Sequence, residues 1–265
     1  MNPYKCTFLM GIESTLEYRF GFFVSILSAV FPILIQTTMW NYLYGQSDMA
    51  AVFGYSYDQI LVYTLLATIV SQLVSGEAWT VNADIKLGGL NKYLVRPVSY
   101  MRYVLCNVLG NKVPKAMVLG PVAAGMLLFS VVVLNLSLTV WRVFAFLISL
   151  FLGILLNFFI FYCVALIGFW LTDVDKLFGT VSIVVVVISG GVFPMDIFGK
   201  AAEIMVNLLP FGYTTQFPVN IINGRFGAER ILLGFMSQIL WLLLFMFISR
   251  IMWNRGLKRY VAVGG

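Results

Sequence analysis

The sequence predicts an all-α integral membrane protein, and three observations support this fold class. Hydrophobic residues make up 61% of the 265 residues and charged residues only 11%, whereas soluble proteins carry about a quarter charged residues. Long uncharged runs recur along the chain between charged residues. Aromatic residues reach 16%, which suits lipid contact and the aromatic belts at membrane surfaces. We therefore expect a single membrane domain over residues 1–265.

Six runs are candidates for membrane spans, because a helix needs about 20 apolar residues to cross about 30 Å of hydrocarbon. The predicted spans are residues 20–42, 60–76, 113–134, 143–171, 178–192 and 231–249. The second is short and is expected to extend past Glu77, and the fourth is long enough to tilt or protrude. The fifth is rich in β-branched residues, but an isolated strand would leave its backbone groups unpaired in lipid, so a helix is expected.

The distribution of basic residues predicts the orientation in the membrane. Six spans place both termini on one side, and that side holds all but four of the 17 lysines and arginines. The four on the opposite side are Arg142, Lys200, Arg225 and Arg230. Cytoplasmic loops carry the excess of Lys and Arg, so both termini are expected in the cytoplasm. The net charge of +6 is thereby explained without a nucleic-acid partner.

The inner segment between the second and third spans, Asp84 to Lys112, is the most informative polar stretch. A helical wheel predicts an apolar face formed by Leu87, Leu90, Tyr93 and Leu94. The polar face holds Asn91, Lys92 and Arg96. Pro97 is expected to end this helix and Ser99 to cap the next. Such a basic amphipathic helix either lies on anionic lipid or docks a cytoplasmic partner.

The outer segment, Ser189 to Arg230, predicts short helices folded back into the outer leaflet. Glycine and proline would interrupt a helix near residue 190, while residues 197–209 are too apolar for a solvated loop. This element either gates the outer end of a pathway or forms a structural cap. The residues assigned to it are Gly190, Gly191, Phe193, Pro194, Pro210 and Phe211.

A few polar residues fall within the spans or at their edges. Gln36, Gln72 and Asn157 either line a substrate path or bond neighbouring helices. Glu77 and Asp84 lie at the inner membrane edge, where an ion pair with adjacent lysines or arginines is favoured over a proton relay.

The sequence offers no catalytic or metal site. It contains no histidine and only three widely spaced cysteines, so it lacks the commonest general base and any disulfide or metal-binding pattern. No GxxxxGK[ST] phosphate loop occurs, and Gly199–Lys200 lacks the required preceding glycine. We therefore expect this chain to bind no cofactor itself.

Two motifs resemble those of type-2 permeases of ATP-binding-cassette exporters, and the layout covers nearly the whole chain. The inner match is carried by Asp84, Ile85, Gly89, Leu90, Leu94, Arg96, Pro97 and Ser99. The outer match is carried by Leu209, Pro210, Phe211, Tyr213, Phe217, Pro218 and Gly224. The N-terminal segment would be the family's connecting helix on the inner face, with Tyr4, Phe8, Ile12 and Leu16 at i, i+4 spacing.

The resemblance implies a permease subunit in a prokaryotic cell membrane. It would pair with a second permease subunit, identical or not, and with two copies of an ABC ATPase that holds ATP and Mg²⁺. The inner motif would be the ATPase-coupling element. An apolar, aromatic interior favours export of an amphipathic or hydrophobic cargo. Two alternatives are an ion-coupled secondary transporter with a broken fifth span and a non-transporting membrane assembly subunit.

Overall fold

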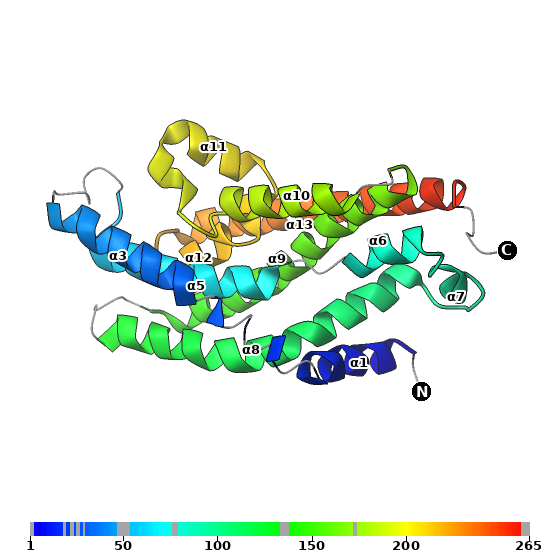
Figure 1. Ribbon diagram of the computed structural model, residues 1–265. Coiled ribbons are helices and arrows are strands. Elements are labelled where there is room, and N and C mark those ends of the chain that lie inside the picture. The colour runs from blue at the N-terminus through cyan, green and yellow to red at the C-terminus, as the bar shows by residue number, and fades with distance from the viewer. Residues whose placement is uncertain are drawn as a thin grey trace.

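The computed structural model is predominantly helical in the residues it describes. These are residues 3–17, 20–21, 24, 27–28, 30–46, 54–75, 79–132, 138–171 and 174–260. Among them no strand occurs, which agrees with the predicted all-α class. Figure 1 shows long helices running side by side, with shorter helices gathered at their ends.

Within the described residues, four helices are long and apolar enough to cross a membrane. They are α5 (Tyr57–Val74), α8 (Tyr100–Val132), α9 (Val140–Leu166, continued by the 3₁₀ helix η1, Ile167–Phe169) and α13 (Ala228–Leu257). They coincide with the predicted second, third, fourth and sixth spans.

The other two predicted spans coincide with shorter helices. α3 (Val30–Gln46) has 17 residues and α10 (Val174–Ile188) has 15, which correspond to about 26 and about 23 Å of helix. The helical conformation of α10 confirms that its β-branched run is not a strand. The first predicted span begins at Phe20, and residues 22, 23, 25, 26 and 29 lie outside the described part of the chain.

The ends of several helices differ from the ends of the predicted spans. α8 begins at Tyr100, directly after Ser99, the residue predicted to cap this helix, and therefore starts 13 residues before the predicted span. α13 continues to Leu257, because Gly256 lets it pack tightly against the ring of Phe169. α5 does not extend past Glu77, since the chain leaves the helical conformation at Ser75, where ψ is 127°.

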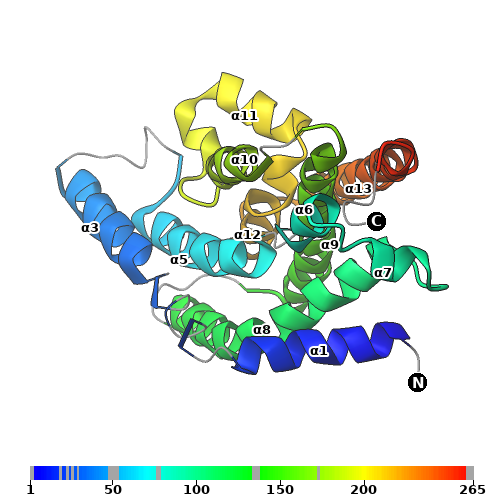
Figure 2. The same cartoon turned by 45° about the vertical axis from the view of Figure 1, so that its right-hand side comes forward.

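The N-terminal helix α1 (Pro3–Glu17) lies along the first part of α8 (Figures 1 and 2). Glycines on both helices permit this contact, because a Cβ on Gly11 would collide with the carbonyl oxygen of Asn107, and one on Gly110 with that of Phe8. The predicted helix is confirmed, and Tyr4, Phe8 and Ile12 of its predicted apolar face are half-buried. Thr7 and Gly11 are buried, whereas Leu16 is 49% exposed.

Helix α9 is the centre of the core. It packs against α5, α13 and two short helices, α6 (Trp79–Lys86) and α12 (Gln216–Ile222). The side of α9 that faces the core carries buried leucines and aromatic residues, including Leu156 and Tyr162.

The remaining short helices lie at opposite ends of the molecule in Figure 1. α7 (Asn91–Leu94) lies with α6 and both chain termini at one end, which we call the inner end. The other end, the outer end, holds α11, the end of α3 and the start of α5. The helices of the predicted re-entrant segment are η2 (Met195–Phe198), α11 (Lys200–Leu208), η3 (Phe211–Tyr213) and α12.

Candidate functional sites

The inner segment consists of two short helices joined by a tight turn. α6 ends at Lys86, and the chain turns at Gly88, whose φ is 74°. α7 then forms one turn, Asn91–Leu94. A continuous amphipathic helix over this segment, as predicted, is therefore wrong. The cause is local, because Gly88 adopts the left-handed conformation that ends a helix.

The carboxylate of Asp84 holds this turn together. Asp84 Oδ2 accepts a 2.8 Å hydrogen bond from the hydroxyl of Tyr100, and Asp84 Oδ1 lies 3.7 Å from the ammonium of Lys92. A side chain at position 89 would collide with Asp84, so only glycine fits there. The ring of Tyr100 also stacks on Trp253 of α13, with centroids 5.2 Å apart. An ion pair for Asp84 was predicted, and the Lys92 contact confirms it; Glu77 lies outside the described residues.

The inner motif divides into buried and exposed residues. Ile85 and Leu90 are 7% and 0% exposed and belong to the core of the chain. Leu87 and Val95 are 81% and 83% exposed. The predicted common face of Leu87 and Leu90 is thus wrong, since the turn at residues 87–90 sends the two side chains to different environments. The exposed side chains of this segment are those of Leu87, Asn91, Lys92, Leu94, Val95, Arg96, Pro97 and Ser99.

An ion pair connects the inner segment to α10. The ammonium of Lys86 lies 3.1 Å from Asp175 Oδ2, and the amide of Asn82 donates a 2.6 Å bond to Asp175 Oδ1. These contacts hold the pKa of the Asp175 carboxyl, which precedes the predicted fifth span, below its usual value. α6 and the start of α10 are therefore linked through polar contacts at the inner end.

The outer segment begins where α10 ends, at Ser189, Gly190 and Gly191. Gly190 has a φ of 77°, and its carbonyl accepts a 2.7 Å bond from the hydroxyl of Tyr63. Neither glycine has room for a Cβ, because Tyr63 and Gln216 contact Gly190 and Ser71 contacts Gly191. The predicted helix break is confirmed, and it lies against α5 and α12.

Beyond the break, the predicted outer residues occupy different positions. Phe193 meets Trp40 of α3 edge to face, with ring centroids 6.1 Å apart. Pro194 precedes η2, and Pro210 and Phe211 begin η3. The short helices predicted for this segment are present, but the structure does not gather their prolines and aromatic rings into one site.

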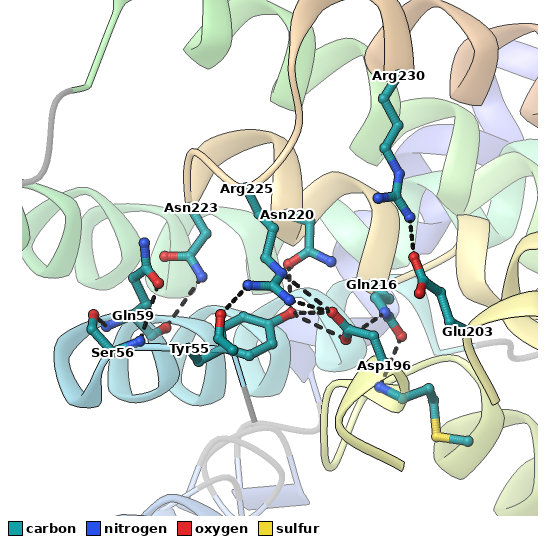
Figure 3. Close-up of polar contacts among 12 residues, drawn as sticks. Tyr55, Ser56, Gln59, Asp196, Glu203, Gln216, Asn220, Asn223, Arg225 and Arg230 are labelled. Carbon is teal, nitrogen blue, oxygen red and sulfur yellow. Dashed lines mark hydrogen bonds and ion pairs between the residues drawn. The ribbon is translucent and has the colours of Figure 1, made fainter. Parts of the chain in front are cut away.

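A polar network fastens the outer segment to α5 (Figure 3). The guanidinium of Arg225 contacts Asp196 through Nη2 at 3.1 Å and Nε at 3.2 Å. The hydroxyl of Tyr55 donates to both oxygens of Asp196, and Arg225 lies 3.8 Å from the centroid of the Tyr55 ring. Gln216 Nε2 donates a 3.1 Å bond to Asp196 Oδ1. Two helices, η2 and α12, and the connections before α5 and before α13 thereby meet at one carboxylate.

Sequence reasoning did not select Tyr55, Asp196 or Gln216. One pattern in the sequence could have indicated this ion pair. Asp196 and Arg225 have opposite charges and lie on either side of a segment that was predicted to fold back. Their pairing could not be read from the sequence, because 28 residues that form several short helices separate them.

The three polar residues predicted for a substrate path do not form one site. Asn157 is 4% exposed, and its Oδ1 has no hydrogen-bond partner. It lines a cavity of about 70 Å³ that also contacts Ser71, Ser189 and Thr215, but neither Gln36 nor Gln72 reaches that cavity. Gln36 is buried on α3, and Gln72 is half-buried on α5.

These features define a multi-pass helical membrane protein. At its inner end a turn is held by the contacts of Asp84, and at its outer end a segment of short helices folds back. The described residues contain no cluster of three metal-ligating side chains, and the three cysteines are free.

The chain belongs to the ABC-2 transporter family. The family model described as ABC-2 family transporter protein matches residues 23–264, which confirms the resemblance found in the sequence. The protein is accordingly a permease subunit of the ABC transporter class, a class that works with separate ABC ATPase subunits. Comparison with curated proteins gives no match.

Proposed function

We propose that the protein exports an amphipathic or hydrophobic molecule, driven by ATP that two separate ATPase subunits hydrolyse at the inner end. The observation that carries this proposal is the exposed apolar group Leu87, Leu94 and Val95, which lies on a turn held by the contacts of Asp84. We call these three residues the docking group.

The docking group is suited to contact another protein. Large apolar side chains that are 48–83% exposed on a rigid, basic turn mark an interaction surface. Each contributes about 1.5–3 kcal/mol when fully buried. Lys92 and Arg96 beside them add positive charge that would orient a partner with an acidic groove rim.

The inner segment also has a physical route to the membrane helices. A push on the docking group is transmitted through the Asp84–Tyr100 bond to α8 and through the Lys86–Asp175 pair to α10. A rigid turn with two such attachments converts closure of the ATPase subunits into tilting of these helices.

The arrangement in the membrane is part of the proposal. The chain crosses a prokaryotic cell membrane six times, with both termini in the cytoplasm, and α3 and α10 belong to the first and fifth crossings. α3 and α10 carry exposed apolar side chains, such as Ile35 at 68% and Ile183 at 69%. Lipid or a second permease subunit would cover them, and cargo would pass between the two permease subunits. Whether the two permease subunits are identical is left open.

A co-purification experiment tests the function. The double variant Leu87→Asp/Val95→Asp, produced together with its ATPase, should lose the ATPase and the transport-linked ATP hydrolysis. Val140→Asp is the matched control, because Val140 is 71% exposed at the outer end and should leave the complex intact. Transport without ATP by a protein that never retains an ATPase would end the proposal.

The ion-coupled alternative has less support. It predicts a break in the fifth span, as α10 has, but it also needs a titratable group inside the membrane. Among the described residues, the only charged side chain that is less than a tenth exposed is Lys112, which donates a hydrogen bond to the carbonyl of Ser75. The assembly-subunit alternative predicts that the docking-group variants leave ATPase activity unchanged.

A further inference from the structure

A cavity at the inner end has a mixed basic and apolar lining. It measures about 710 Å³ and lies between the start of α8, the turn after α7 and the last part of α13. This volume is in the range of ligand-binding pockets, about 300–1,000 Å³. The cavity is distinct from the docking group except for Leu94, which borders both.

Three arginines surround this cavity without an acidic counterpart. Arg96, Arg102 and Arg250 line it, and no lining residue is acidic. None of the three guanidinium groups forms an ion pair within the described part of the chain. Three unpaired guanidinium groups around one cavity favour a ligand with negative charge and several oxygen acceptors, as in a phosphate group.

Tyr162 provides a second, independent observation. Its side chain lines the cavity and is 1% exposed, yet its hydroxyl has no hydrogen-bond partner. A buried hydroxyl without a partner is costly, and a ligand oxygen in the cavity would satisfy it.

The apolar part of the lining indicates that the ligand carries a hydrocarbon chain. Met101, Met246 and Phe247 lie beside the arginines, and Phe247 is 63% exposed. Arg250 is the first charged residue after the apolar run 231–249, a run about 28 Å long as a helix. In the proposed orientation, Arg250 therefore lies at the depth of the inner headgroups.

We propose that this cavity binds the phosphate headgroup of an anionic phospholipid from the inner leaflet. Arg102 and Arg250 contact the phosphate, Tyr162 donates to a headgroup or ester oxygen, and the acyl chains lie along Met246 and Phe247. The proposal depends on the membrane orientation but not on the ATPase partner.

Binding to the purified permease without its ATPase tests this site. The probes are dioctanoyl phosphatidylglycerol, dioctanoyl phosphatidylcholine and glycerol phosphate, each measured by native mass spectrometry and by the shift in Tm. Phosphatidylglycerol should bind most tightly. Arg102→Gln/Arg250→Gln should weaken it about 30-fold, because each basic residue near an anionic lipid contributes about a fivefold gain in affinity. Tyr162→Phe should weaken it about fivefold by removing one hydrogen bond.

Arg255→Gln/Arg259→Gln is the matched control, since it removes the same charge at the inner end but outside the cavity. Unchanged phosphatidylglycerol binding in the Arg102/Arg250 variant, or equal losses in both double variants, would overturn the proposal. If glycerol phosphate bound as tightly as phosphatidylglycerol, the phosphate would not need to come from a lipid. The cavity would then be a site for a soluble phosphate compound, and the lipid proposal would be wrong. Because no ATPase is present, none of these results depends on the docking experiment.

Discussion

Arg225 and Asp196 form a partly buried ion pair at the outer end, with their side chains 28% and 12% exposed and a closest contact of 3.1 Å. The pair also lies against the ring of Tyr55, two residues before α5. It therefore ties the folded-back segment to a membrane-length helix, and a gate at this end would have to move around it.

Removing the charge of Asp196 should destabilise the protein. Asp196→Asn leaves the guanidinium of Arg225 in a partly buried site without its counter-charge, and we expect a loss of about 1–3 kcal/mol, measured as a lower Tm in detergent. The control is Glu203→Gln, which breaks the Arg230–Glu203 pair whose side chains are 48% and 41% exposed. Exposed pairs contribute at most about 1 kcal/mol, so similar losses in both variants would contradict a special role for Asp196.

Leu90 and Leu87 should respond differently to the same substitution. Leu90→Asp places a charge in the core, because Leu90 is fully buried, and should lower the yield of folded protein through a loss of several kcal/mol, about 3 or more. Leu87→Asp should fold normally and impair only the association with the ATPase. Size-exclusion elution and Tm separate the two outcomes, and a well-folded Leu90→Asp variant would refute the buried position of Leu90.

A side chain at position 89 should disturb the inner turn. Gly89→Ala would place a Cβ against Asp84 and loosen its bond to Tyr100, so trypsin should cleave after Lys86 or Lys92 faster than in the unmodified protein. Gly179→Ala on α10 is the control, because nothing lies near its Cβ position. Equal cleavage rates in all three proteins would show that Asp84 does not hold the turn.

The contact between α1 and α8 should be equally sensitive to one methyl group. Gly110→Ala would push the backbone of α1 away at Phe8, and maleimide should then label the half-buried Cys6 of α1 faster. In Gly120→Ala, on the same helix but with open space around the Cβ position, the labelling rate should not change. No difference between the variants would mean that α1 adapts without leaving α8.

Length and apolar composition were enough to predict the membrane-length helices, because lipid leaves a backbone few alternatives to the helix. The helix ends differ from the predicted spans where a helix continues beyond its apolar run. α8 continues back to Tyr100 because α1 and Trp253 cover its first turns, and these partners come from distant parts of the sequence.

The sequence by itself determined that this is a helical membrane protein of the ABC-2 family, because its apolar composition and its two motifs can be read without knowing the tertiary contacts. Only the tertiary structure decided which motif residues face outward. The turn at Gly88 separates Leu90 from Leu87, although a regular helix would have kept them on one face. Likewise, the pairing of Asp196 with Arg225 and the gathering of Arg96, Arg102 and Arg250 depend on chain segments that meet only after folding, because interactions between distant residues leave no periodic signal in the sequence.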